Sequence, residues 1–283
     1  MIRSGTWLVA ALGIAAGAAA ADTPLERGKY LVEGILTCGN CHTPRVQGGA
    51  LDTARLHAGG PQTWETSEYT VKGANITPDR ETGIGGWSAD DLRRAIRDGV
   101  RPNGQQLSPQ MPYGYYRIFT PADLEAVVVY VRSLPPVPGK VAASVYKVAK
   151  MHVETPAGAD QPMPESAMRD PVRRGFYLVT IGHCMECHSP RTDGRSDLKN
   201  ALGKGGEKFA GPWGVSVSRN ITSHPVAGLG AWSDAEIKRA ITQGVGRDGR
   251  KLLPPMGFAW YARMTAPDLD AIVAYLRTVP PLE

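Results

Sequence analysis

Two five-residue stretches decide how this chain folds: Cys38-Gly39-Asn40-Cys41-His42 and Cys184-Met185-Glu186-Cys187-His188. They contain all 4 cysteines of the 283 residues. On a helical turn, residues three apart lie on one face, so both thiols of a stretch face the same way. Two thiols that add to the vinyl groups of one porphyrin edge, followed by a histidine that ligates iron, form the attachment signature of c-type haem. We therefore expect two covalently bound haem c groups.

Two other interpretations of the paired cysteines are weaker. A redox disulfide of the thioredoxin kind needs a strand–helix–strand context, whereas the periodicity within each repeat is helical. A zinc site would use a cysteine pair as half of its ligands, with His42 as a third. Neither interpretation explains why a histidine directly follows both pairs.

The chain beyond residue 23 is an internal duplication. Residues 24–136 align with residues 171–281, and the segment RGKYLV at 27–32 matches RGFYLV at 174–179. A repeat of this length indicates two whole domains rather than a solenoid. We expect a first domain over 22–136, a Pro- and Ala-rich linker over 137–170, and a second domain over 171–283.

Each copy predicts a few short helices. Apolar residues between 124 and 131, and again between 269 and 276, recur with helical spacing. Ser88 with Asp91, and Ser233 with Glu236, predict capped helices that end near Gly99 and Gly244. Residues 46–74 and 192–219 show no period, so we expect long loops there. The expected fold is mainly α, with a few short helices and long loops around a covalent haem in each domain.

Glycines and tyrosines predict where helices meet. Gly28 and Gly175 lie on the helix before each cysteine motif, and Tyr130 and Tyr275 lie on the last helix of each repeat. A glycine allows a second helix to approach closely, and an aromatic side chain fills the space beside it. We expect the first and last helices of each domain to cross at these residues.

The second axial ligand of each iron must come from another part of the repeat. Met111 and Met256 are the methionines at equivalent positions, each in a Pro-rich stretch at a matching distance after His42 or His188. A methionine thioether is a known haem ligand, although methionine also fills gaps in cores. The expected haem-binding set is Cys38, Cys41, His42, Met111, Cys184, Cys187, His188 and Met256, with His42, Met111, His188 and Met256 on the two irons.

Other polar residues have two open interpretations. Arg45 and Arg191, at the same offset after each motif, either pair with haem propionates or are simply exposed. Asn75 and Asn220 either hydrogen-bond near the haem or form a turn. The histidines without a counterpart in the other repeat are expected at the surface or in local packing: His57, His152, His183 and His224.

The N-terminus has the layout of a secretory signal peptide over residues 1–21. Arg3 is followed by an uncharged run from Trp7 to Ala21 that ends in small residues. This run is shorter than the ~20 residues that a membrane-spanning helix needs. We expect export to the periplasm, which agrees with haem attachment outside the cytoplasm. The formal charge is only +5 and the basic residues are not clustered, so nucleic acid is not an expected partner.

These motifs together make the chain resemble a cytochrome c of two class I-type domains. More closely, it resembles the cytochrome subunits of periplasmic, membrane-associated dehydrogenases for alcohols, gluconate and aldehydes. The resemblance lies in the two cysteine motifs, in NITP at 75–78 with GIGGWS at 83–88, in MPY at 111–113 and in the closing AYLRTVPP at 274–281. It implies His42 and His188 as proximal ligands and Met111 and Met256 as distal ligands.

The resemblance also implies an electron carrier rather than an enzyme. Such a cytochrome takes electrons from a dehydrogenase catalytic subunit and passes them to a downstream cytochrome, an oxidase or quinone. The alcohol and gluconate members carry three haems, whereas this sequence has two motifs and ends at Glu283, so a two-haem carrier with at most peripheral membrane association fits better. The alternative is a dihaem peroxidase, which would need one iron with an open position, and the matched Met111 and Met256 argue against it.

Overall fold

The computed structural model describes residues 22–47, 49–192, 195–211 and 213–283. The predicted signal peptide over residues 1–21 lies outside the described residues. No helix within these described ranges combines the length and hydropathy needed to cross a bilayer.

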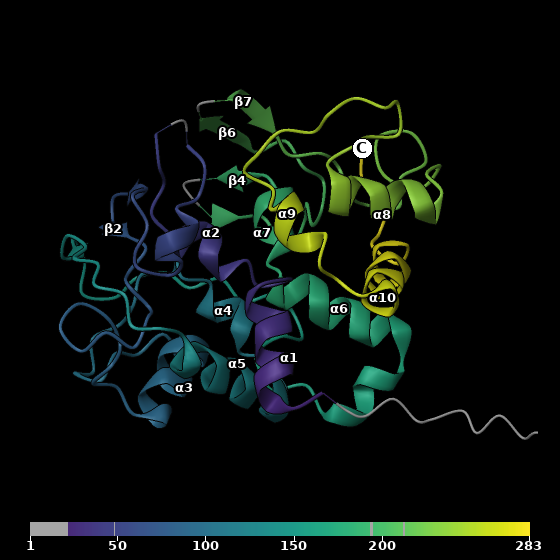
Figure 1. The fold of residues 1–283 in the computed structure, drawn as a ribbon. Coiled ribbons are helices and arrows are strands. Elements are labelled where there is room, and N and C mark those ends of the chain that lie inside the picture. The colour runs from purple at the N-terminus through teal and green to yellow at the C-terminus, as the bar shows by residue number, and fades with distance from the viewer. Residues whose placement is uncertain (1–21, 48, 193–194, 212) are drawn as a thin grey trace, which may run out of the picture.

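The two repeats fold into the same order of helices (Figure 1). In the first repeat these are α1 (Pro24–Val32), α2 (Cys38–His42), α3 (Ala89–Asp98), α4 (Tyr113–Tyr116) and α5 (Pro121–Ser133). In the second they are α6 (Pro171–Ile181), α7 (Cys184–His188), α8 (Asp234–Gln243), α9 (Phe258–Tyr261) and α10 (Ala266–Leu276). Each half therefore contributes three helices of nine or more residues and two of about one turn.

The predicted helix boundaries are confirmed at α3 and α8. The side chain of Ser88 accepts from the backbone N–H of Asp91 and the carboxylate of Asp91 accepts from the N–H of Ser88, which forms a capping box. Ser233 and Glu236 repeat that arrangement at α8. Gly99 closes α3 at a φ of 68°, in the left-handed region that glycine adopts without steric cost.

The long loops expected over 46–74 and 192–219 contain short strands that the sequence did not predict. The first segment contains β1 (Thr63–Glu65) and β2 (Tyr69–Lys72), which pair antiparallel. The second contains two further hairpins: β4 (Arg191–Thr192) with β5 (Arg195–Ser196), and β6 (Lys208–Gly211) with β7 (Gly214–Val217). Strands of two to four residues are too short to show the alternating pattern by which a strand is recognised in a sequence.

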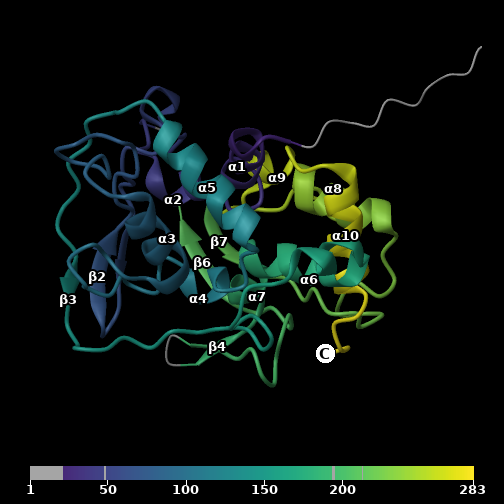
Figure 2. The same cartoon turned by 90° about the horizontal axis from the view of Figure 1, so that it is seen from below.

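The linker folds onto the first domain. Its strand β3 (Val145–Tyr146) pairs with β2 and completes a three-stranded sheet at the edge of the first half (Figure 2). Further along, Met151 is buried between Tyr69 and Val71. The carbonyl oxygen of Glu154 lies against Gly114, so closely that a Cβ there would overlap it. The short helix η2 (Glu165–Arg169) then leads into α6.

The expected helix crossings are confirmed in both halves. A Cβ at Gly28 would overlap the carbonyl oxygen of Ala126 and lie 2.7 Å from the Cβ of Tyr130. At Gly175, a Cβ would overlap the carbonyl oxygen of Ala271 in the same way. α1 thus packs directly against α5, and α6 against α10, with no side chain between the backbones.

Replacing Gly28 with Ala should separate α1 from α5. The added methyl group meets backbone atoms that cannot rotate away, so we expect a loss of about 3 kcal/mol in the free energy of unfolding, near the upper end for overpacked sites. Chemical denaturation followed by far-UV circular dichroism measures the loss. Gly86→Ala is the matched control because no atom lies within 4 Å of a Cβ at that position. Equal effects of the two substitutions would contradict the close approach.

The two halves share one hydrophobic core and meet around α1 and α6 (Figure 1). At the start of α5, Asp123 accepts two hydrogen bonds from Arg27 of its own half, at 2.7 and 2.8 Å. Its Oδ2 accepts a third hydrogen bond, at 2.7 Å, from the hydroxyl of Tyr177 in the other half. Tyr177 is fully buried and Asp123 is 6% exposed.

The same arrangement occurs in the reverse direction at the start of α10. Asp268, 1% exposed, accepts from Arg174 of its own half at 2.6 Å and from the hydroxyl of Tyr30 of the other half, also at 2.6 Å. Each domain thus has a buried aspartate that is bonded to its own arginine and to its neighbour's tyrosine. The contact between the halves is therefore a pseudo-twofold one, in which equivalent residues play equivalent roles.

This contact makes the fold sensitive to alkali. Burial, followed by the hydrogen bond to the Asp268 carboxylate, raises the pKa of Tyr30 to about 12, compared with about 10 for an ordinary tyrosine. The folded protein holds this proton more tightly than the unfolded chain does, so its stabilising effect is complete below pH ~10 and is lost as the pH rises towards ~12. We expect Tyr30→Phe to flatten the fall of stability across this window. Parallel pH profiles for the native protein and the variant would contradict this role.

Candidate haem sites

Both cysteine motifs fold as one-turn helices with the same entry. α2 and α7 each begin at the first cysteine and end at the histidine. The residue before each helix, Thr37 or His183, lies in the left-handed region with a φ of 49° or 42°. The chain therefore turns sharply into each motif, and the two motifs present their cysteines and histidine in the same way.

The two motif histidines are oriented by the backbone. Nδ1 of His42 is hydrogen-bonded to the carbonyl oxygen of Ala74 at 2.7 Å, and Nδ1 of His188 to that of Arg219, also at 2.7 Å. A carbonyl oxygen can only accept, so Nδ1 carries the proton and Nε2 is left with its lone pair. Burial lowers the pKa of both histidines, which favours the neutral ring. This is the form that binds a metal, and a carbonyl on the other ring nitrogen is its common support.

The cysteines are suited to attachment rather than to a redox disulfide. All four are free, and Cys38 and Cys184 pack against the hydrophobic core. Burial raises the pKa of each of these two thiols to about 12. Redox-active cysteines of the thioredoxin kind have a lowered pKa instead. The described residues also contain no cluster of three His, Cys, Asp or Glu side chains arranged to hold a metal ion.

The two matched methionines occupy equivalent turns. Met111 lies two residues before α4, and Met256 lies two residues before α9. The carbonyl oxygen of each methionine accepts a hydrogen bond from the backbone N–H of the first residue of that helix, at 2.7 and 3.0 Å. Both side chains are half-buried and pack against the main core. Their role as iron ligands stays a prediction.

Two buried tyrosines lie beside the motifs, and the sequence alone did not indicate them as part of the site. Tyr116 on α4 lies near Cys38 and Cys41, and Tyr261 on α9 lies near Cys184 and Cys187. Burial, followed by the neighbouring thiols, raises the pKa of both hydroxyls well above 10, so they are neutral. Their shared position, five residues after Met111 and Met256, is the signal that could have identified them.

Asn75 and Asn220 form turns, and they also tie the chain to the end of each domain. Asn75 accepts from the N–H and hydroxyl of Thr77 and donates to the carbonyl of Val137 at 2.9 Å. Asn220 accepts likewise from Thr222 and donates to Leu282 at 2.6 Å. Of the two open interpretations, the turn is therefore the one that the geometry supports.

The two arginines after the motifs differ from each other. Arg45 donates to the carbonyl of Gly49 and to Asn40, and it is exposed. Arg191 bonds to Glu186 at 3.2 Å, and its Nε is buried without a hydrogen-bond partner among the described residues. A half-buried guanidinium with an unused, buried Nε donor near Cys187 is suited to an anionic group such as a haem propionate. With respect to the arginine that follows the motif, the second site therefore suits a haem propionate better than the first.

His57 belongs to local packing rather than to the surface. It is 1% exposed, its φ is 64°, and its backbone N–H donates to Thr43. Gly203 makes the equivalent bond to Ser189 in the second repeat, at a φ of 76°. His57 thus has the left-handed backbone conformation that glycine has at the equivalent position of the second repeat.

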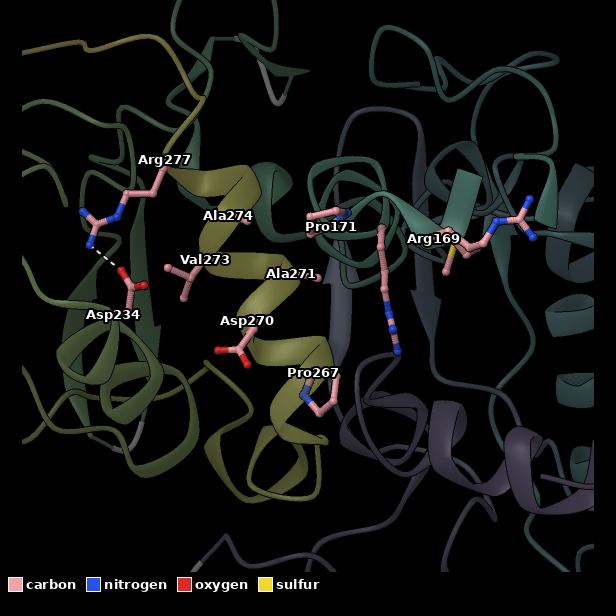
Figure 3. Close-up of a pocket in the computed structure, with 11 residues that line it drawn as sticks. Arg169, Pro171, Asp234, Pro267, Asp270, Ala271, Val273, Ala274 and Arg277 are labelled. Carbon is pink, nitrogen blue, oxygen red and sulfur yellow. Dashed lines mark hydrogen bonds and ion pairs between the residues drawn. The ribbon is translucent and has the colours of Figure 1, made fainter. Parts of the chain in front are cut away.

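A cavity of about 640 Å³ lies away from both motifs, on the outer side of α10 (Figure 3). Two of its arginines are already in ion pairs, Arg277 with Asp234 at 2.8 Å and Arg174 with Asp268 at 2.5 Å. None of the eight predicted haem-binding residues lines it. We therefore place the candidate site at α2, α4, α7 and α9 instead.

The comparisons with known proteins agree with this geometry. The cytochrome c family model matches residues 25–135 and again residues 172–280. The chain belongs to the cytochrome c family. Cytochrome c domains indicate covalently bound haem c, which accounts for the two free thiols and the oriented histidine of each motif.

The relatives of this chain are electron-transfer proteins. It is 30% identical over 90% of its length to the fructose dehydrogenase cytochrome subunit of Gluconobacter japonicus, and 31% identical over 98% to the cytochrome c subunit of the quinone-dependent alcohol dehydrogenase of Gluconacetobacter polyoxogenes. It covers 52% and 62% of those two chains, so it spans little more than half of them. A diheme cytochrome c-type protein of Cereibacter sphaeroides is 30% identical and is covered over 86% of its length. All three of these relatives are named as cytochromes or as cytochrome subunits.

Proposed function

We propose that this chain is a periplasmic dihaem electron carrier that accepts electrons from a dehydrogenase catalytic subunit and delivers them to a respiratory acceptor. The observation that carries the proposal is the double occurrence of one complete site. In each half, two free thiols precede a histidine whose Nδ1 is bonded to a carbonyl, and a methionine follows at the start of a one-turn helix.

The protein's own residues supply what an electron carrier needs. When bound, haem iron provides a one-electron couple between its ferric and ferrous states. The carbonyls of Ala74 and Arg219 hold the histidine rings in one orientation, and the Pro-flanked turns hold Met111 and Met256. With His42 and Met111 on one iron and His188 and Met256 on the other, neither iron would have a position left for a substrate such as peroxide. Ligands held in this way would suit the transfer of one electron with little rearrangement.

The proposed partners follow from the relatives. Two of them are named as cytochrome subunits of dehydrogenases for fructose and for alcohol. We infer a dehydrogenase catalytic subunit as the electron donor of this chain, and a cytochrome, an oxidase or quinone as the acceptor. The predicted signal peptide over residues 1–21 supports a periplasmic location, and we infer peripheral association with the outer face of the inner membrane.

The experiment is a gentle purification of the tagged protein from its native host. We expect two haems per chain by haem staining and pyridine haemochrome assay, and a flavin-, quinone- or molybdenum-containing protein in stoichiometric amount. A dye-linked assay over alcohols, aldehydes and sugar acids then identifies the donor's substrate class. A chain with fewer than two haems, or one that itself turns over peroxide, would overturn the proposal.

A further inference from the structure

The ligand loop of the second domain packs on the haem-attachment turn of the first. α9 begins two residues after Met256, and its Trp260 is 7% exposed. The ring of Trp260 covers Gly39 so closely that a Cβ at that residue would lie 2.8 Å from Cζ2 and nearer still to Cη2. Gly39 stands between Cys38 and Cys41, so the ring of one domain packs on the attachment turn of the other.

Neighbouring residues hold this contact from both sides. A Cβ at Gly257 would lie 3.1 Å from the side chain of Thr37, the residue that turns the chain into α2. On the other side, the guanidinium of Arg263 lies 5.2 Å from the centre of the Trp260 ring and bonds to Glu33 at 3.2 Å. The segment from Gly257 to Arg263 therefore packs against residues 33–39 of the first domain along its length.

The reverse contact is looser. Tyr115 takes the place of Trp260 in the first repeat, and Met185 takes the place of Gly39 in the second. Tyr115 and Met185 line a cavity of about 60 Å³. The counterpart of Arg263 is Ile118, which carries no charge. The tight contact thus runs in one direction, from the methionine loop of domain 2 to the attachment turn of domain 1.

We propose that Trp260 is a positioning residue for the haem of the first domain, although it belongs to the ligand loop of the second. Its ring fixes the Cys38–His42 turn at Gly39 and covers that side of the turn from water. Through this contact, the state of the Met256 loop and the potential of the first haem depend on each other, because a coupling between two sites is reciprocal. The inference rests on the proposed function, in that both motifs carry haem.

Trp260→Leu tests the role by potentiometric titration of the loaded protein. Without the ring, water reaches the attachment turn, and a more polar surrounding favours the ferric over the ferrous state. We expect the midpoint potential of the first haem to fall while that of the second changes less. The transition of the first haem is identified independently as the one that moves in Met111→His. Trp232→Leu is the control, since Trp232 is another tryptophan of domain 2, half-buried and packed on the core but not on Gly39.

Gly39→Ala provides a second variant that leaves Trp260 in the sequence. The new methyl group displaces the ring, so it should lower the same potential, and it should add little in the Trp260→Leu background, where the ring is absent. Non-additive shifts of this kind support the contact. A Trp260→Leu protein with two haems and an unshifted first potential overturns the positioning role but leaves the proposed function intact. Fewer than two haems in the native protein overturns the proposed function itself.

Discussion

Replacing Met111 with Ala should allow the reduced protein to bind about one carbon monoxide per chain, whereas the native protein binds none. Alanine cannot ligate iron, so the first haem loses its distal ligand while the second keeps Met256. The measurement is a carbon monoxide titration of the dithionite-reduced protein, followed in the Soret band. About half of the haem absorbance should shift.

Met264→Ala is the matched control for this experiment. Met264 is a buried methionine of the second domain that packs in the core and has Phe119 as its counterpart. Its loss creates a cavity but removes no predicted ligand, so carbon monoxide should still not bind. If Met111→Ala behaves like Met264→Ala, then Met111 is not the distal ligand. Met256→Ala should open the second haem instead.

Asp123→Ala should destabilise the protein by about 3–5 kcal/mol, the range for removing one partner of a buried ion pair. The substitution leaves the Arg27 guanidinium and the fully buried Tyr177 hydroxyl without their shared acceptor. Because Tyr177 belongs to the other half, both domains lose stability together. Guanidinium unfolding followed by circular dichroism measures the change.

Asp90→Ala provides the comparison. Asp90 also pairs with an arginine, Arg93, but its side chain is 85% exposed, and such surface pairs contribute about 0–1 kcal/mol. The loss of unfolding free energy from Tyr177→Phe should lie between the losses from Asp123→Ala and Asp90→Ala. This substitution removes only one hydrogen bond from Asp123, at a cost of about 1 kcal/mol. If Asp123→Ala costs no more than Asp90→Ala, the aspartate does not hold the two halves together.

The sequence predicted those features of the fold that local residues determine. Ser88, Asp91 and Gly99 fix the ends of α3 through hydrogen bonds within a few residues, and the structure confirms them. Gly28 and Tyr130 predicted the crossing of α1 and α5, because only a glycine admits a backbone so closely. The hairpins were not predicted, because strands of two to four residues are too short to show a period in the sequence.

The candidate site was predictable only within each repeat. The cysteine motifs and the matched methionines appear when one copy is compared with the other. The contacts between copies do not appear in this way, because the comparison does not show which faces meet. The comparison therefore does not indicate that the hydroxyl of Tyr30 reaches Asp268 of the other half. For the same reason, nothing in the sequence distinguished Trp260 from an ordinary core tryptophan.

The reciprocal bonds of Asp123 and Asp268 have a consequence for how such a protein can change over time. Two identical chains meeting through this surface would have to change both sides of it at once, since every substitution would appear twice. Joining the copies in one polypeptide removes that restriction. One side can carry Trp260 on Gly39 while the other carries Tyr115 beside Met185, and the aspartates still hold the pair together. The fusion thus lets two originally equivalent centres acquire different properties without loss of their assembly.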